Sequence, residues 1–362
     1  MQGNSKHKSN LSEVDGVKQP KTTNKTSINK IKLNRSKQPS VTQFIEEIKK
    51  GNIPFLSKAI TLIESTNVKH KEKASAIINA CLPFANKSIR IGITGVPGVG
   101  KSTFIESLGT HLSSKGKKIA VLAIDPSSSV NKGSILGDKT RMEELVKNEH
   151  VFIRPSPSGN SLGGVARKTR ETIILCEAAG FDTIFIETVG VGQSETVVHS
   201  MVDFFLLLKL AGAGDELQGI KRGIIEMADA IVINKADGDN EKAAKLAKAE
   251  FTRALHLYPL RADKWQPKVT TCSAFYHKGI DQIWQIIKSY LELTKANNHF
   301  ELKRIKQNEF WLLETINQQL LEGFYQNETI KPNLKKELDK INKQQTSPFE
   351  AAERLLRIRR DK

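Results

Sequence analysis

Nine residues from Gly95 to Thr103 have the types and spacing of a phosphate-binding loop, because their sequence GVPGVGKST matches G-x-x-x-x-G-K-[ST]. Glycines let successive backbone N–H groups converge on phosphate oxygens, and the start of a following helix adds the positive end of its dipole. Lys101 can reach the β- and γ-phosphates, and the Ser102 hydroxyl can ligate Mg²⁺. The predicted nucleoside triphosphate site therefore contains Gly95, Val96, Pro97, Gly98, Val99, Gly100, Lys101, Ser102 and Thr103, with Lys101 also assigned to catalysis.

The flanks of this loop are those that the motif requires. Residues 89–94 alternate like a short strand, and residues 102–115 carry apolar side chains at helical spacing. A glycine-rich turn without function is the alternative. The strand before the loop and the helix after it favour the phosphate site.

A second motif, Asn234-Lys235-Ala236-Asp237, directly follows the apolar run at residues 230–233. An Asp carboxylate can accept hydrogen bonds from the ring N–H and the exocyclic amine of guanine, whereas adenine lacks this pair of donors. Asn234 can bond the purine edge, and the stem of Lys235 can lie over the ring. A helix N-cap at Asp237 is the alternative. The position after a strand, downstream of a phosphate loop, favours GTP over ATP.

Another candidate strand, residues 269–272, ends at a Ser-Ala dipeptide. A short turn at this place commonly completes a guanine pocket with backbone N–H groups, although the dipeptide alone would mean nothing. The predicted nucleotide site is therefore extended to Ser273, Ala274 and Phe275.

Two acidic residues lie at the ends of predicted strands: Asp125 after residues 119–124, and Glu187 at the end of residues 182–187. A carboxylate at the carboxyl end of a parallel strand sits in the ligand crevice, where it can hold Mg²⁺. An Asp-Pro turn and a half-buried edge residue are the alternatives. Next to Glu187, Gln193 is a candidate for orienting the attacking water, although solvent-facing glutamines are common. The sequence identifies neither a compelling catalytic base nor an arginine finger.

Three longer segments resemble motifs of the methylmalonyl-CoA mutase-associated GTPases, the MeaB/ArgK group. They are ILGDKTRM at residues 135–142, ETVGVGQSE at 187–195 and AGDELQGIKRG at 213–223. Residues 57–64 resemble the family's N-terminal helical segment, and residues 347–356 resemble its C-terminal arm. The resemblance runs from about residue 41 to the C-terminus.

This resemblance implies a GTPase that chaperones an adenosylcobalamin-dependent mutase, gating delivery of the cofactor and protecting the mutase from inactivation. It also implies a homodimer and a P-loop GTPase domain flanked by helical extensions, with GTP or GDP and Mg²⁺ as cofactors. By motif, the Mg²⁺ and switch candidates are Ser102, Asp125, Asp138 and Glu187. A third switch, carrying nucleotide state to the partner, would contain Asp215, Glu216, Gln218 and Lys221; without the resemblance this segment reads as a Gly-rich surface loop.

Strands that alternate with helices predict an α/β fold with a mostly parallel, doubly wound sheet. The expected division is a disordered basic tail (1–40), an N-terminal helical segment (41–82), the P-loop GTPase domain (83–292) and a C-terminal helical dimerisation arm (293–362). Amphipathic helices are predicted within 43–80 and 280–322. A final helix is predicted to begin at Pro348, with Ser347 and Glu350 forming a capping box.

The chain of 362 residues carries a net charge of +17, and nine Lys or Arg residues lie within residues 1–40. No nucleic-acid-binding motif accompanies this charge, so no specific nucleic-acid partner is expected. The apolar run 204–208 is too short to span a membrane, so no membrane association is expected either. Cys81, Cys176 and Cys272 are widely spaced, which predicts buried thiols in a reducing compartment. The cytoplasm is expected rather than the mitochondrion, because transit segments are Arg-rich, whereas residues 1–40 are Lys-rich with one Arg and two acidic residues. The absence of C-x-x-C disfavours metal insertion, and a kinase acting on transport proteins is the other alternative.

Overall fold

The computed structural model describes residues 39–65, 67–124, 142–155, 162–188, 194–212 and 222–360. Within them, seven strands form one sheet in the order β3-β2-β4-β1-β5-β6-β7, and every neighbouring pair is parallel. The α/β fold with a parallel sheet is thereby confirmed. The strands are β1 (Ile89–Gly95), β2 (Ile119–Ile124), β3 (Val151–Arg154), β4 (Thr183–Thr188), β5 (Phe204–Leu210), β6 (Ala230–Asn234) and β7 (Lys268–Thr271).

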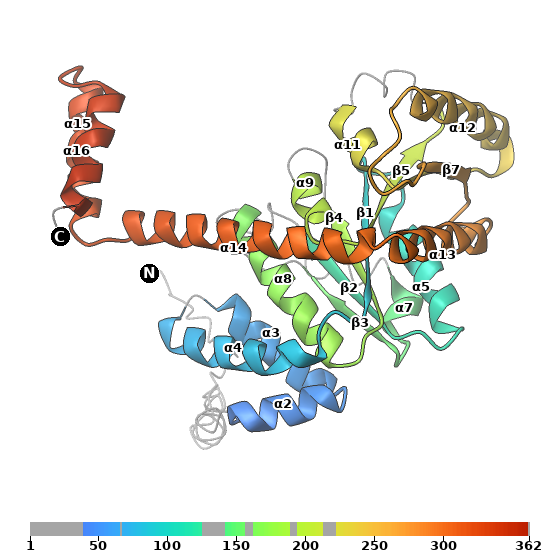
Figure 1. Cartoon of the computed structure of the whole chain (residues 1–362), viewed down its shortest axis with the longest axis horizontal. Coiled ribbons are helices and arrows are strands. Elements are labelled where there is room, and N and C mark those ends of the chain that lie inside the picture. The colour runs from blue at the N-terminus through green and yellow to red at the C-terminus, as the bar shows by residue number, and fades with distance from the viewer. Residues whose placement is uncertain are drawn as a thin grey trace, which may run out of the picture.

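Helices cover both faces of this sheet (Figure 1). On one face lie α2 (Val41–Lys49), α3 (Ile53–Glu64), α4 (Val68–Cys81), α8 (Leu162–Ala178), α9 (Ser194–His199), α11 (Arg222–Met227) and α12 (Glu241–His256). On the other lie α5 (Lys101–Ser113), α7 (Glu143–Val146) and α13 (Ile280–Ala296). Successive residues of a strand alternate between the two cores: Ile184 and Ile186 pack on the first, and Phe185 packs on the second. The central strands are mostly apolar because both of their faces are buried.

The predicted amphipathic helices of the N-terminal segment are α2, α3 and α4. Their apolar faces are buried, with Phe44, Ile48, Leu56 and Ile60 no more than 2% exposed. The Ser40 hydroxyl caps α2 by accepting from the backbone N–H of Gln43. These helices join the core that α8 forms with the sheet, so the segment packs as part of the body. Most of the predicted tail, residues 1–38, lies outside the described residues.

The strand β5 is longer than its apolar run suggested. It continues through Lys209 to Leu210, although a lysine at that place marks the end of the run in the sequence. The side chain of Lys209 is fully buried, and its Nζ lies 5.4 Å from the ring centroid of Phe251 on α12. The long aliphatic stem of lysine packs like an apolar side chain, which is why the strand tolerates it.

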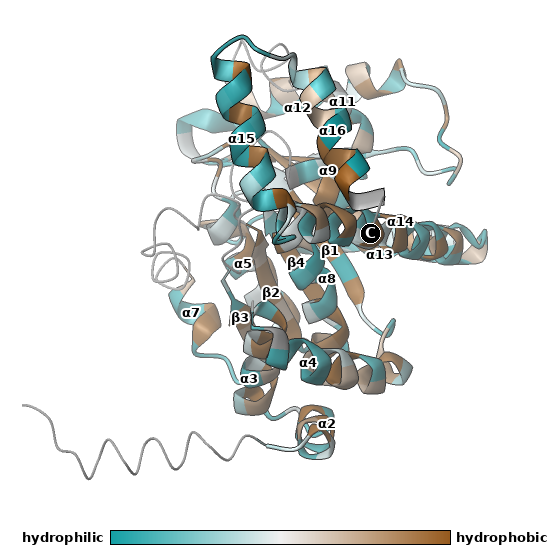
Figure 2. Cartoon of the chain, turned by 90° about the vertical axis from the view of Figure 1, so that its left-hand side faces the viewer, coloured by the Kyte–Doolittle hydropathy of each residue, from teal (hydrophilic) through white to brown (hydrophobic). Residues whose placement is uncertain are grey.

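The C-terminal residues form a long helix and a helical hairpin. The helix α14 (His299–Tyr325) runs away from the body, and α15 (Ile330–Asn342) and α16 (Pro348–Arg360) lie at its far end (Figure 1). Both helices of this hairpin carry hydrophobic as well as hydrophilic residues (Figure 2). The predicted start of α16 is confirmed, because the Ser347 hydroxyl accepts from the N–H of Glu350 at 3.1 Å. The sequence did not predict α15.

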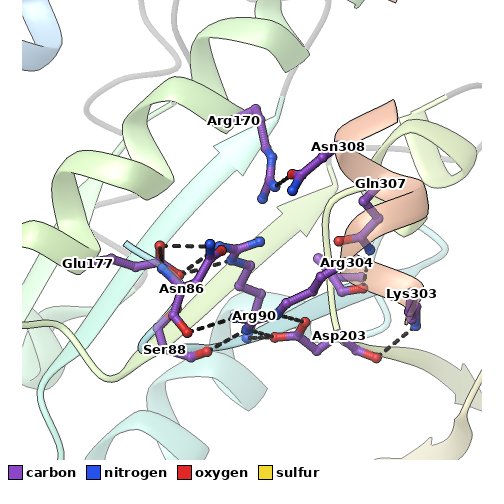
Figure 3. Close-up of polar contacts among 11 residues, drawn as sticks. Asn86, Ser88, Arg90, Arg170, Glu177, Asp203, Lys303, Arg304, Gln307 and Asn308 are labelled. Carbon is purple, nitrogen blue, oxygen red and sulfur yellow. Dashed lines mark hydrogen bonds and ion pairs between the residues drawn. The ribbon is translucent and has the colours of Figure 1, made fainter. Parts of the chain in front are cut away.

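A buried polar network attaches the first turns of α14 to the sheet (Figure 3). The Arg304 guanidinium makes two hydrogen bonds to the Asp203 carboxylate, at 2.8 and 2.7 Å, and also donates to the backbone oxygens of Asn86 and Ser88. Beside it, Arg90 pairs with Glu177 at 2.9 Å. Burial pushes the pKa of Asp203 up, but the hydrogen bonds and charge of Arg304 outweigh it, so the pKa lies below its ordinary value. The network therefore holds the Asp203 carboxylate ionised under the arm.

The cysteines and the lengths of the described helices can also be compared with the sequence predictions. Cys81, Cys176 and Cys272 are free and buried, as predicted. Burial raises the pKa of the Cys81 thiol to about 11 and that of Cys272 to about 12, which makes both thiols poor nucleophiles. Among the helices that the structure describes, none combines the length and apolar character needed to cross a membrane.

Candidate nucleotide site

The predicted nucleotide-site residues that the structure describes gather at the carboxyl edge of the sheet. Central β1 lies between β4 and β5, and its register places Ile93 opposite Glu187 and Gly95 opposite Leu208. Farther along, Leu210 lies opposite Asn234. In open parallel sheets, ligands bind outside the carboxyl ends of the strands, where the strand order reverses. Here the reversal occurs at β1, because the chain moves to β2 and β3 on one side and later to β5 on the other.

The phosphate loop connects β1 directly to α5, which begins at Lys101. The Nζ atom of Lys101 lies across this loop and donates to the backbone oxygens of Gly95 at 2.8 Å and Val96 at 3.3 Å. Gly100 precedes the helix with φ +91°, and a Cβ atom there would lie 2.9 Å from Nδ2 of Asn234. Only glycine fits this approach between the loop and the second motif. The helix start and the lysine together suit an anionic ligand.

Two oxygen-bearing side chains meet beside the loop. The Ser102 hydroxyl lies 3.4 Å from Oε1 of Glu187, which is 5% exposed. At the same edge, the Thr188 hydroxyl donates to that of Thr94 at 2.9 Å. Hydroxyl and carboxylate oxygens are the ligands that Mg²⁺ prefers, so the pair fits that ion. In the part of the chain that the structure describes, no three His, Cys, Asp or Glu side chains are grouped so that they could hold a metal ion, but Mg²⁺ usually takes only one or two carboxylates and completes its shell with water and phosphate oxygens.

The Asp237 carboxylate does not cap a helix. Asp237 directly precedes the short 3₁₀ helix η3 (Gly238–Asn240), yet its side chain makes no capping hydrogen bond there. Instead it accepts a short hydrogen bond from the hydroxyl of Ser273. The N-cap alternative is therefore contradicted, and the carboxylate faces the Ser-Ala turn as a base pocket requires.

The Asn234 side chain connects three parts of the site, which the sequence did not predict. It is 2% exposed, and its amide donates to the backbone oxygen of Val99 at 2.9 Å. Its carbonyl accepts from the N–H of Ala274 at 3.1 Å and from the thiol of Cys272 at 3.3 Å. One amide hydrogen is left to serve a purine edge. The side chain thus acts mainly between protein groups, tying the phosphate loop to the base pocket.

The remaining predicted residues divide into two groups. Lys235 is exposed and adopts a left-handed backbone with φ +56°, and Phe275 is 73% exposed with its ring 5.0 Å from that of Tyr276. The others lie outside the described residues, so their roles stay predictions. They are Asp125, Asp138, Gln193, Asp215, Glu216, Gln218 and Lys221.

Comparison with known proteins identifies a family model and several relatives that are similar to this chain. The family model described as methylmalonyl Co-A mutase-associated GTPase MeaB matches residues 56–329. GTPase ArgK of Escherichia coli (strain K12) is 45% identical over 80% of this chain and 88% of its own length. The mitochondrial methylmalonic aciduria type A homolog of Mus musculus is 42% identical over 90% of this chain and 81% of its own.

A solved structure supports the same relationship. The crystal structure of a LAO/AO transport system kinase has a TM-score of 0.70 and 36% sequence identity, and the match covers 88% of this chain and 97% of that one. The family match spans most of the chain, and the relatives carry GTPase names across the same region. This chain is therefore a P-loop GTPase that belongs to the MeaB family of methylmalonyl-CoA mutase-associated GTPases.

Proposed function

We propose that this GTPase chaperones an adenosylcobalamin-dependent acyl-CoA mutase of the methylmalonyl-CoA mutase type, gating the loading of its cofactor and protecting it from inactivation. The observation that carries the proposal is the family match over residues 56–329, whose description names association with that mutase. A mitochondrial relative named for methylmalonic aciduria supports it. The ArgK and transport-kinase names of other relatives point to a second candidate, a kinase acting on transport proteins.

In the proposed nucleotide site, residues 95–103 hold the phosphates, and Asn234, Lys235 and Asp237 read guanine together with the turn at residues 273–275. The lysine Nζ already lies over the loop, so a small side-chain movement would bring it to the β- and γ-phosphates. Bound between Ser102 and Glu187, Mg²⁺ would neutralise the charge that develops on the phosphates. Phosphoryl transfer needs mainly positioning and charge neutralisation, which these residues supply.

Replacing Glu187 by glutamine should raise the Mg²⁺ concentration needed for half-maximal GTP hydrolysis by about 10–100-fold. Glutamine keeps the size of the side chain but removes the negative charge that holds the ion beside Ser102. Magnesium titrations of the hydrolysis rate measure the change. Glu149→Gln removes a charge from an exposed position and should leave the titration as in the wild type. An unchanged magnesium requirement in Glu187→Gln would remove this residue from the proposed metal site.

A homodimer through the C-terminal arm is part of the proposal. The arm exposes many large apolar residues on α14, and α15 and α16 enclose an apolar groove of about 240 Å³ at its tip. A second copy of the chain would bury them. Sedimentation equilibrium tests this, and a monomer at every concentration would contradict it. The exposed residues are Leu302, Ile305, Phe310, Leu312, Leu313, Ile316, Leu320 and Leu321.

Recovery of mutase subunits on the immobilised full chain should depend on the bound nucleotide. A switch GTPase presents different surfaces with GDP and with a non-hydrolysable GTP analogue, so the two states should recover mutase in different amounts. Cell extract passed over both states, with Lys101→Ala as a control that binds phosphates poorly, measures this. Recovery of no mutase in either state would overturn the chaperone proposal.

A phosphate-transfer assay separates the second candidate from the first. With GTP labelled at the γ-phosphate, a GTPase chaperone releases the label as free phosphate, whereas a kinase leaves it on a protein.

The three free thiols favour a reducing compartment, such as the expected cytoplasm, for this reaction.

A further inference from the structure

The turn that follows β7 is held closed at its base. We call residues Ser273–Gly279 the base loop. Ser273 and Lys278 exchange two backbone hydrogen bonds, at 3.1 and 3.0 Å, and the N–H of His277 donates to the oxygen of Ala274 at 3.3 Å. The first residues of the loop face Asp237 and Asn234, whereas Phe275 and Tyr276 at its tip are exposed. The loop is thus compact, with few contacts at its tip.

The far side of the base loop adopts unusual backbone conformations. Gly279 has φ +78°, and a Cβ atom there would lie 2.8 Å from the backbone oxygen of Thr271. His277 has φ +55°, in the left-handed region that residues with side chains seldom adopt. Such a conformation persists where the surroundings impose it, and it is a reason to ask what the side chain does there.

The His277 side chain reaches the helix that begins at the phosphate loop. Its Nδ1 shares a hydrogen bond of 2.7 Å with the hydroxyl of Ser107, which is 1% exposed on α5. Ser107 lies less than two turns after Lys101 on that helix. The base loop is therefore connected to the phosphate-binding helix through His277 on its far side, while Asn234 connects its first residues to the phosphate loop through Ala274 and Val99.

We infer that His277 is a positioning residue, which fixes the base pocket relative to the phosphate loop through its hydrogen bond to Ser107. A single nucleotide must touch the pocket at one end and the loop at the other, so the separation of the two decides how well both ends bind. A site held at the right separation before binding loses less freedom when the nucleotide arrives. The inference rests on the proposed location of the nucleotide site.

The test is a pair of variants, each removing one side of the hydrogen bond. Ser107→Ala leaves the backbone of the base loop untouched, and His277→Asn places there a residue that tolerates positive φ. Both should raise the Kd for GDP and the KM for GTP about 3–10-fold, with kcat within twofold of the wild type. The Kd of the double variant for GDP should be no higher than that of the single variant that binds GDP more weakly, because the two residues act through one hydrogen bond.

A matched control and two further measurements make the test decisive. His256 is exposed on α12 and bonds Gln266 at 2.8 Å, so His256→Asn should bind GDP as the wild type does. Lowered Tm in both test variants with an unchanged Kd would show a purely structural role and overturn the inference. If Asp237→Asn leaves guanine preference unaltered, the proposed pocket itself is wrong. If that variant alters preference while Ser107→Ala and His277→Asn bind GDP normally, only the inference about His277 fails.

Discussion

Replacement of Asp237 by asparagine is expected to change the preferred nucleotide from GTP to xanthosine triphosphate. The carboxylate accepts from the Ser273 hydroxyl and does not cap η3, and in the proposed site its oxygens also accept from the base. Guanine offers two N–H donors to it. An asparagine amide can still accept from the ring N–H, but its NH₂ group would face the exocyclic amine and leave that donor unpaired, which should weaken GTP binding about 100-fold or more. Xanthine has a carbonyl in place of the amine, and that carbonyl pairs with the amide.

Calorimetric titrations with GTP, xanthosine triphosphate and ATP measure this change. Asp239 lies two residues farther along, exposed in η3, and provides a control with the same chemical change. Asp239→Asn should keep the preference of the wild type for GTP. Asp237→Asn with an unaltered preference for guanine would mean that the base binds elsewhere, and the contacts around Ser273 would then be only structural.

The sheet could be predicted from the sequence because most of its strands are short, mainly apolar segments, and the central ones are buried on both faces. The strand predicted at residues 119–124 is β2 without change, and the one at 182–187 differs from β4 by one residue. The helix α15 could not be predicted in the same way. Its apolar residues Ile330, Leu334, Leu338 and Ile341 recur at helical spacing but are separated by lysines and other polar residues. The partner that covers three of them is α16, which lies farther along the chain. Local periodicity gives no sign of such a partner.

In the site, too, motifs of consecutive residues could be predicted from the sequence, whereas contacts between residues far apart in the sequence could not. Within each nucleotide motif the residues are adjacent in the sequence, so the sequence alone identifies them, and each motif follows a strand whose carboxyl end lies at the same edge of the sheet. The bridge that Asn234 makes to Val99 joins residues 135 positions apart, and the bond between Ser107 and His277 joins residues 170 apart. Neither residue type indicates such a partner by itself. These connections follow from the strand order, which the sequence does not specify in detail.

The second large effect is expected at Arg304, where α14 meets the sheet. Replacing Arg304 by methionine keeps much of the apolar volume but leaves the Asp203 carboxylate, 1% exposed, without its bidentate partner. It also leaves the backbone oxygens of Asn86 and Ser88 without this donor. Breaking one side of a buried ion pair costs about 3–5 kcal/mol of stability, because the other charge stays buried. Thermal unfolding of the full chain, followed by circular dichroism, should show a clear fall in Tm.

Lys306 lies on the same helix but is exposed, so Lys306→Met should change stability by about 0.5 kcal/mol or less. Adding Asp203→Asn to Arg304→Met should recover part of the loss, since the unpaired charge is then removed. If Arg304→Met is no less stable than Lys306→Met, the network does not hold α14 to the sheet.

It is also informative which part of the chain loses stability in Arg304→Met. Arg304 contacts the segments that precede both β1 and β5, so its loss should destabilise the nucleotide-binding body together with the arm. Selective proteolysis at the joint between α13 and α14, with GDP binding intact, would instead show that the arm detaches alone.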